Sequence, residues 1–467
     1  MRLPASMVNK GGQVWTPKTL SDWLLRVPGG VSPREARYGY FGPGSGLLQK
    51  DITAAGDAFL STDFFVNTFG AKVWDSLNSQ TRFFNLLRKV AWGPTTGYRI
   101  RSGRNLSTQP VSETGALPTI DSPDLQTVYI QPKFIVTSLG VTALAQFLGT
   151  LEGGIGDALA VSQETAMIDH TKKLNQMLLA SGSQRVVAGG GTPDEVVDVN
   201  WLSVGDIVNG TTVAGDVTVV TVTPATNIMS YAGNALATDE IIFIKSRAGF
   251  ASIDDIVEMT NRTINGVALG AAKAPNYGSL VMADRDTGEW NASQVYDNAG
   301  VLRHMTTGLL DQAIDSVRRK GGEPDLVVTG VEQVTRLGTI LQANQHFIGE
   351  GTFQVKLGGE GTLKGYPTGF QVATYKGIPV FHDFDAPTSV QLAANGDSKR
   401  GANAYVLDTR FLEIPVLFTT QYMESRDYLQ NNMLGIKAIY LTAGDLRCLD
   451  FVKQAKICDL SDGINLV

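Results

Sequence analysis

Apolar residues recur at helical spacing over one long stretch of the chain, from Val141 to Ser181. Glycines between positions 149 and 156 divide this stretch into a short leading helix and a longer second helix. We expect the second helix to begin near Asp157 and to end at the breaker formed by Ser181 and the two residues that follow it. About 25 helical residues at 1.5 Å each span roughly 37 Å, which makes this helix a strut for flatter elements. The apolar positions that carry the pattern are Val141, Leu144, Leu148, Leu151, Ile155, Leu159, Met167, Leu174, Met177 and Leu178.

The period changes to that of a β-strand in the segment from Thr95 to Lys133. Two alternating runs, Tyr98 to Arg101 and Val128 to Ile130, bracket a polar stretch rich in Ser, Thr, Pro and Gly. This pattern predicts a long two-stranded ribbon with a loose tip. Because such a ribbon is marginally stable alone in water, we expect it to lean on a partner surface.

The segment from Val186 to Gly249 contains short Val-, Ile- and Thr-rich runs and few helix formers. The pair Asn209-Gly210 is a tight-turn signal. These features predict a small all-β module inserted between helices, either as an outward decoration or as part of the core sheet.

Helical and strand patterns alternate after this module. Residues 252–265 and 295–320 have helical patterns, residues 326–328 form a buried strand, and residues 331–342 follow as another helix. The alternation predicts a compact α/β unit. The tail then returns to strand-like runs, at residues 404–418 and 434–457.

The remaining segments are less regular. Residues 1–70 are broken by Pro and Gly but rich in aromatics, so we expect an arm that becomes ordered across another surface; a floppy terminus is the alternative. Residues 72–90 predict an amphipathic helix. The Gly-rich segment from Gly349 to Gly365 predicts a mobile surface loop.

Composition excludes several classes of protein. The 467 residues indicate about three domain-sized units, and the 43% hydrophobic content supplies their cores. A mean hydropathy of −0.01 and the lack of long apolar runs exclude a membrane protein. The N-terminal residues contain no secretory apolar region, and Cys448 and Cys458 make no disulfide framework, so we expect synthesis in a reducing compartment.

The charge balance also limits the partners of the chain. The net charge is −6, and the sequence has no basic tail or Lys/Arg run of the kind that gathers nucleic acid by neutralising phosphates. If the chain encloses DNA, a force other than charge attraction must drive the DNA in.

The residues that could carry chemistry form no recognisable site. The four histidines lack metal-ligand spacing, and we interpret the run from His382 to Asp385 as structural. The run from Asp284 to Gly288 lacks the further ligands of a calcium loop, the Gly-rich segment makes no phosphate cradle, and no Gly-x-Ser-x-Gly motif occurs. We therefore expect no catalytic, cofactor-binding or metal-binding residues, and a structural protein rather than an enzyme. The histidines are His170, His304, His346 and His382, and sequons of little meaning without secretion begin at Asn105, Asn209, Asn261 and Asn291.

The order of these elements resembles that of the HK97-fold major capsid proteins of tailed double-stranded DNA viruses. The local matches are the run Tyr375-Lys-Gly-Ile-Pro-Val, the helix end from Met177 to Ser183, and the segment from Gly321 to Thr329. The first resembles a strand and turn of that family's axial domain, and the third resembles the link from an axial helix to its central strand. The matches occur in family order over residues 72–460.

The resemblance implies an α+β fold with seven parts. Residues 1–70 would be an N-terminal arm, 71–140 the start of the peripheral domain with an extended loop at 95–133, and 141–185 the spine-helix region. Residues 186–250 would be an inserted β-rich module and 251–294 peripheral domain or linker. Residues 295–430 would be the axial domain, and 431–467 the return of the chain to the peripheral domain.

The resemblance also implies a function. The chain would form hexamers and pentamers of an icosahedral shell in the virion, assembled in the host cytoplasm around double-stranded DNA without sequence-specific contacts. Portal, scaffolding or decoration proteins would be its partners, and no membrane would be involved. Some relatives cross-link through a lysine of the extended loop, but Thr95 to Pro132 contains none, so we expect non-covalent locking. The first 70 residues lack long helices, so a separate scaffolding protein, or none, is expected.

The sequence is compatible with two alternatives. An encapsulin-like compartment would share the fold and enclose protein cargo, and the nucleic-acid content of purified shells separates it from a capsid. An enzyme with a β-barrel accessory domain would need convergent acid, base or nucleophile residues, which the sequence does not display.

Overall fold

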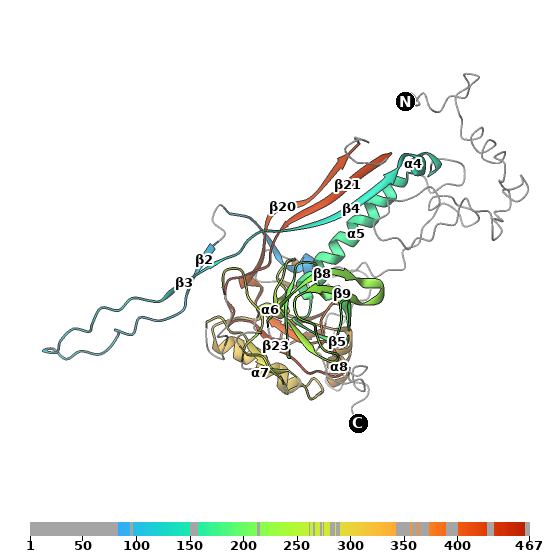
Figure 1. Ribbon diagram of the computed structural model, residues 1–467. Helices are drawn as coiled ribbons and strands as arrows, with labels where there is room; N and C mark the ends of the chain where they lie inside the picture. Colours follow the sequence, from blue (N-terminus) through green and yellow to red (C-terminus); the bar gives the residue numbers. More distant parts are fainter. Residues whose placement is uncertain are drawn as a thin grey trace, which may run out of the picture. The chain divides into compact units, whose positions relative to one another are not determined.

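The computed structural model divides into two compact units (Figure 1). Unit 1 contains Val136–His170 and Thr420–Leu441; unit 2 contains Gln80–Ile135, Thr171–Thr419 and Thr442–Val467. Length alone indicated three units. The β-rich segment is not a unit of its own, because hydrogen bonds at its two ends connect it to the rest of unit 2. The structure describes residues 83–93, 97–149, 157–212, 215–260, 262–264, 267–270, 273, 275–280, 285, 290–341, 355–356, 362–363, 373–388, 400–426 and 434–462.

The long helical pattern corresponds to α5 (Ala158–Leu179), whose 22 residues span roughly 33 Å. The side chain of Asp157 accepts a hydrogen bond from the backbone N–H of Leu159 at 3.0 Å, which caps the helix where the sequence indicated. The leading helix is α4 (Ala143–Gly149). It begins later than expected because residues 141 and 142 end the strand β4 (Lys133–Thr142), which the helical pattern had concealed.

Unit 1 is a helix packed on a sheet. Strands β20 (Leu412–Ser425), β21 (Gly435–Gly444) and β4 lie in that order, and α5 packs against their unit 1 portions. Gln163 donates to the hydroxyl of Tyr422 at 2.6 Å and accepts from that of Tyr440 at 3.2 Å. The apolar contacts between helices and sheet involve Leu139, Val141, Ala145, Ala158, Leu159, Ala166, Ile436 and Ala438.

Unit 2 is built around a six-stranded mixed sheet. Its central strand β14 pairs parallel with one neighbour, β18, and antiparallel with the other, β19. Side chains of β14 alternate between two apolar clusters, so both faces of the sheet are buried, as expected for an α+β arrangement. In order, the strands are β13 (Gln294–Tyr296), β23 (Ala455–Ile457), β19 (Ala404–Leu407), β14 (Leu326–Thr329), β18 (Ile378–His382) and β17 (Ala373–Tyr375).

Two amphipathic helices flank this sheet, α7 (Thr307–Arg319) and α8 (Val331–Leu341). The expected helix over 295–320 is wrong in its first half, since β13 occupies its start. Thr306 caps α7 by accepting from the N–H of Leu309 at 3.2 Å, and the backbone at Ala299 and Gly300 has positive φ, which interrupts any earlier helix.

The β-rich segment forms a closed six-stranded barrel with its own apolar core. Its strands do not join the central sheet. The Asn209-Gly210 pair is not a turn but the end of β7, where Gly210 gives room to the carboxylate of Glu240. Around the barrel the strands are β10 (Ile241–Ser246), β5 (Ser183–Ala188), β6 (Asp194–Val196), β9 (Ile228–Ala232), β8 (Asp216–Thr223) and β7 (Ile207–Gly210).

The expected helix over 72–90 ends early. Among its described residues only α3 (Phe83–Leu86) is helical, and β1 (Arg88–Ala91) follows as a strand. The backbone of β1 pairs in parallel with residues 413–416 of β20, and this tertiary pairing overrides the helical pattern.

The expected helix over 252–265 is also wrong. Only α6 (Ile253–Ile256) is helical, and the short pair β11 (Thr263–Ile264) and β12 (Val267–Ala268) follows. The guanidinium of Arg285 donates to the carbonyls of Asp255 and Ile256. A continuing helix would need those carbonyls as acceptors for its next turn, so the buried arginine ends it.

Several predictions lie outside the described residues. These are the arm over 1–70, most of the Gly-rich segment, His346, Asn261, and all but Arg285 of the run from Asp284 to Gly288. Within the Gly-rich segment the structure describes the two short paired strands β15 (Val355–Lys356) and β16 (Thr362–Leu363).

Candidate assembly surface

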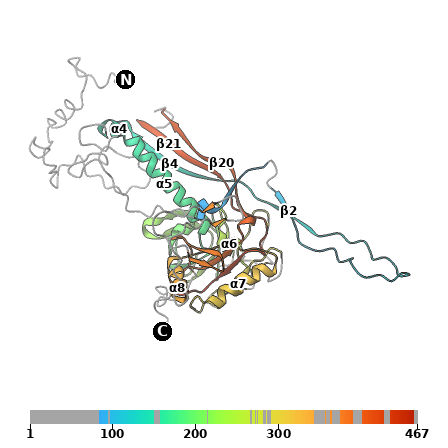
Figure 2. The ribbon, with the colours of Figure 1, turned by 180° about the vertical axis from the view of Figure 1, so that it is seen from behind.

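The predicted ribbon is present. Strands β2 (Gly97–Arg101) and β3 (Leu125–Tyr129) pair antiparallel, with Gly97 opposite Tyr129 and Arg101 opposite Leu125. Figures 1 and 2 show the ribbon, with the loop that it carries, extending away from the barrel and central sheet of unit 2. We define residues 102–124, beyond the last strand pair, as the ribbon tip.

The base of the ribbon is fastened to unit 2. The backbone N–H of Tyr129 donates to the hydroxyl of Ser279 at 2.9 Å, and the N–H of Ser279 donates to the carbonyl of Tyr129 at 2.7 Å. Gly278 has a φ of +57° and lies so close to this carbonyl that a Cβ would be 2.1 Å from the oxygen. Val128 is fully buried, and the hydroxyl of Tyr98 donates to the carbonyl of Cys448. The base is therefore a fixed part of unit 2.

The tip is held by local polar bonds instead of a core. Asp121 accepts from the N–H of Leu106 at 2.7 Å, and the amide of Asn105 donates to the Asp121 carbonyl at 2.6 Å. The N–H of Gly115 donates to the carbonyl of Ser112 at 2.9 Å and closes the turn. These bonds give the tip a defined path without burying its apolar side chains.

The apolar side chains of the tip are open to solvent. Leu106 is 85% exposed, Leu117 is 87% exposed and Ile120 is 100% exposed. Scattered exposed apolar residues are common, but three large ones on a single projecting loop are typical of a surface that another molecule covers.

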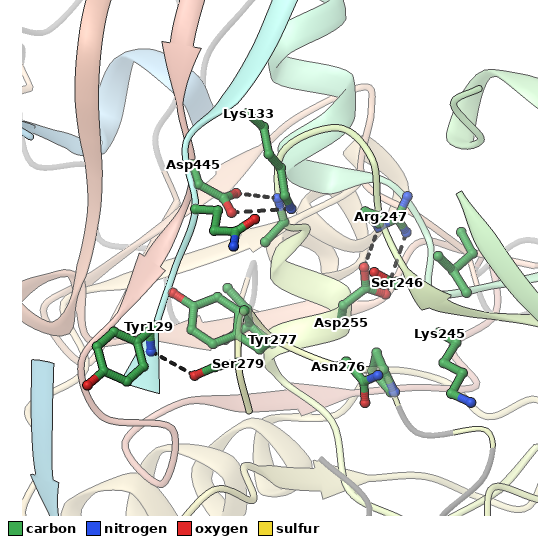
Figure 3. A pocket seen from close by; sticks show the side chains of 16 residues that line it. Tyr129, Lys133, Lys245, Ser246, Arg247, Asp255, Asn276, Tyr277, Ser279 and Asp445 are labelled. Carbon is green, nitrogen blue, oxygen red and sulfur yellow. Dashed lines mark hydrogen bonds and ion pairs between the residues drawn. The ribbon is translucent and has the colours of Figure 1, made fainter. Parts of the chain in front are cut away.

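A pocket of about 310 Å³ lies beside the ribbon base, lined by residues from β3, β4, the barrel, α6 and the loop that carries Ser279 (Figure 3). The charged side chains that line the pocket form ion pairs with other residues of unit 2. Lys133 pairs with Asp445 at 3.2 Å, Arg247 pairs with Asp255, and Lys245 pairs with Asp216 of the barrel at 2.9 Å. The pocket therefore offers no surplus charge to an ionic ligand. Its ion pairs join β4 to Asp445, the residue after β10 to α6, and β10 to β8.

We expect the Tyr98→Phe substitution to lower the free energy of unfolding of the subunit by about 1 kcal/mol, because it removes one partly buried hydrogen bond at the ribbon base. Urea unfolding of unassembled protein measures this change. Tyr296→Phe is the matched control, since its hydroxyl bonds at an exposed site. Equal losses in the two variants would contradict a fixed base.

A cluster of buried charges lies around α6. The ammonium of Lys456, which is 0% exposed, is 3.1 Å from the carboxylate of Asp254 and 2.8 Å from that of Glu258. Arg262 pairs with Glu258, and Tyr405 donates to Asp254 at 2.6 Å. The cluster joins α6 to strands β19 and β23, whose positions in the sequence are about 150 to 200 residues away.

Burial and pairing set the protonation states in this cluster. Burial alone would raise the pKa of Asp254, but Lys456 and hydrogen bonds from Tyr405 and the N–H of Gly182 outweigh it and lower the pKa to about 2. Burial alone would lower the pKa of Lys456, but its two carboxylate neighbours raise it. Arg285, which has carbonyl partners, has its pKa lowered by burial to about 10. All three groups are charged at neutral pH; Asp254 and Lys456 form an ion pair, whereas Arg285 is held by backbone carbonyls.

Asp383, Asp385 and His170, which the sequence offered as possible metal ligands, interact with other residues of the chain. Asp383 accepts from the N–H of Phe83 at 3.2 Å, and Asp385 pairs with Lys172 at 2.8 Å. Asn175 lies between the two carboxylates and donates to both. His170 is buried and lies 2.8 Å from the hydroxyl of Thr137. Within the described ranges, no three His, Cys, Asp or Glu residues gather as a metal site, and no helix is long and apolar enough to span a membrane.

Both cysteines are 0% exposed, and burial raises the pKa of both thiols, that of Cys458 to about 12. A thiolate is the reactive form, so we expect neither thiol to react with a disulfide reagent at pH 8 until the protein unfolds. Counting modified thiols per chain with and without denaturant checks this. Stoichiometric modification of the folded protein would contradict the burial of Cys448 and Cys458.

Sequence reasoning located the ribbon but missed the buried charge cluster. Lys456 lies between Ala455 and Ile457 in an otherwise apolar strand, and Glu258 and Arg262 have the i, i+4 spacing of a helical ion pair. A charged residue in a buried-strand pattern was the available signal. Its partner in α6 could not be read from the sequence, because about 200 residues separate Lys456 from Asp254.

No protein-family model matches the chain, and neither does any of the curated proteins. Among solved structures, the capsid asymmetric unit of Cyanophage A-1(L) is similar at a TM-score of 0.47 and 13% identity, covering 90% of this chain and 98% of the other. The capsid of an empty GTA particle is similar at a TM-score of 0.42 and 10% identity, covering 83% and 98%. The holo-SrpI encapsulin complex from Synechococcus elongatus PCC 7942 is similar at 0.38 and 10% identity, covering 82% and 89%. Because each TM-score is below 0.5, we base the function on the features of the chain itself.

Proposed function

We propose that this chain is an HK97-fold major capsid protein that assembles into hexamers and pentamers of an icosahedral shell around double-stranded DNA. The observation that carries the proposal is the ribbon, whose base is fastened in unit 2 while its tip exposes Leu106, Leu117 and Ile120. A surface of this kind is stable in water when another copy covers it.

The symmetry of the assembly follows from the type of contact between copies. A projecting ribbon and the surface that receives it are different parts of the chain, so their contact is heterologous. Heterologous contacts form rings when the rotation between copies closes, and rings of five and six copies tile a closed shell. Each contact is modest, and many contacts per shell give the assembly its stability.

The order of elements along the chain supports the same assignment. The ribbon, the helix α5, the helices α7 and α8 with the strands β14, β17, β18 and β19, and then the strands β20 and β21 follow one another in the order of the HK97 resemblance. In this proposal α5, β4 and β21 belong to the peripheral domain, and the barrel is an insertion. The mixed sheet belongs to the axial domain, and it includes β23 from the stretch 431–467 that the resemblance assigned to the peripheral domain. The role is mechanical, and we assign the chain no catalytic step.

The partners are also part of the proposal. Other copies of the chain are the first, packaged DNA is held without sequence-specific contacts, and portal, scaffolding or decoration proteins complete the particle. Assembly in the host cytoplasm fits the two buried free thiols. Because the ribbon has no lysine, locking between copies is non-covalent.

Electron microscopy of the purified full chain, followed by nuclease treatment, tests the proposal. We expect closed polyhedral particles and, when they are isolated from the system that packages them, DNA that survives the nuclease. Closed particles that contain protein cargo and no DNA would favour an encapsulin-like compartment. A chain that stays a single copy would overturn both assignments.

A further inference from the structure

The six-stranded barrel carries nearly all of the net charge of the chain. From Ser183 to Ser246 the sequence has seven Asp and Glu residues against one Lys and one Arg. The other 403 residues have 38 acidic residues against 37 Lys and Arg residues, so they are almost neutral. An asymmetry of this size means that the barrel and the rest of the subunit respond differently to a charged neighbour.

The barrel is attached to unit 2 on the side of β10. The outer face of β10 packs Ile241 and Phe243 against Ile264 and Leu269. Just after β10, Arg247 donates to the carbonyl of Ser181 at 2.6 Å, which joins the two ends of the barrel segment. Arg247 also donates to the carbonyl of Trp201 at 2.9 Å. One side of the barrel is therefore buried by its attachment.

The opposite side of the barrel is open. In the strand order β10-β5-β6-β9-β8-β7 the strand across the barrel from β10 is β9, flanked by β6 and β8. Exposed residues on these three strands include Glu195, Ala232 and Val220, the last 48% exposed. The open side thus presents the exposed acid Glu195 beside the uncharged Ala232 and Val220.

Two buried acids of the barrel have backbone N–H partners. Glu240 accepts from the N–H groups of Thr212 at 2.7 Å and Ala237 at 2.8 Å. Asp206 accepts from the N–H groups of Ser203 and Ala248, each at 2.8 Å. These partners are backbone N–H groups, which carry no formal positive charge.

We infer that the barrel lies on the outer surface of the assembled shell, with the side formed by β6, β9 and β8 facing solvent and away from the packaged DNA. This inference rests on the proposed function. A barrel inside the shell would hold a net negative charge, repeated in every copy, against a polyanion packed at high density. Screening weakens repulsion beyond about 8–10 Å but does not remove it at contact distance. On the outer surface the same charge keeps particles apart and soluble.

Labelling of one introduced thiol tests this placement. In the Ala232→Cys variant of the full chain, a maleimide carried on a folded protein too large to pass through a closed shell should label intact particles as completely as dissociated subunits. The native chain is the control, because its two thiols are buried. Particles in which Ala232→Cys is labelled only after they are opened would overturn the outward placement and leave the capsid function standing.

A charge measurement gives a second, independent readout. The Glu195→Gln variant removes one exposed negative charge per copy with little change of shape. Intact particles of this variant should migrate more slowly toward the anode than native particles. Unchanged mobility of intact particles, with a clear change in dissociated subunits, would place Glu195 inside. A chain that forms no closed shell would overturn the proposed function and this inference together.

Discussion

Replacement of Leu106, Leu117 and Ile120 by serine is expected to abolish assembly while leaving the subunit folded. Burial of a large apolar side chain contributes about 1.5–3 kcal/mol, so loss of three from each contact weakens it by a factor on the order of a thousand or more. Because all three side chains are exposed in the subunit, the free energy of unfolding should change by less than about 0.5 kcal/mol per substitution. Sedimentation velocity at micromolar concentration measures the loss of particles, and circular dichroism checks the fold.

A matched triple variant controls for loss of exposed apolar area in general. Val197, Val204 and Val220 are also exposed, at 43%, 60% and 48%, but they belong to the barrel segment. Their replacement by serine should leave assembly intact. If the barrel variant and the ribbon variant lose assembly equally, the ribbon tip has no special role and the proposed contact is wrong.

The Lys456→Met substitution is expected to produce the largest loss of subunit stability. It leaves the buried carboxylates of Asp254 and Glu258 without their shared cation, and removal of one partner from a buried ion pair costs about 3–5 kcal/mol. The loss should appear as a large shift of the denaturant midpoint of unit 2. Trp290 packs beside the apolar cluster of this unit, so tryptophan fluorescence reports on it.

The measurement needs a background that does not assemble, because shell contacts would add to the apparent stability. The ribbon-tip triple variant supplies that background. Lys453→Met is the control, since this lysine pairs with Asp450 at a more exposed position and should cost less than about 1 kcal/mol. If the two lysine substitutions cost the same, the buried cluster does not stabilise unit 2 as we describe.

The sequence pattern predicted the elements whose signal is local. The paired runs that became β2 and β3, the apolar spacing of α5 and the β-rich barrel segment all depend on residues near one another in the chain. The start of α5 near Asp157 is also a local signal and was predicted. The ribbon, as the candidate assembly surface, was therefore accessible to sequence reasoning, although the individual exposed residues of its tip were not.

The predictions of secondary structure were wrong where a partner distant in the sequence determines the local structure. Residues 88–90 continue a helical pattern but become a strand because β20 pairs with them. The helix α6 begins at Ile253 and stops after one turn because Arg285, about 30 residues away, donates to the carbonyls that the next turn would need. Tyr296 has a helical context in the sequence, yet it pairs with Ile457 in the central sheet. In each case tertiary hydrogen bonds outweigh local propensity, and no local pattern reveals them.

Hydrogen–deuterium exchange of the ribbon tip, residues 102–124, tests most directly whether another copy covers it. Backbone amides of the tip should exchange quickly in the unassembled subunit and far more slowly in purified particles, while the base at Tyr129 is protected in both. Exchange of the tip at the same fast rate in particles and in free subunits would show that no copy covers it, and would contradict the account.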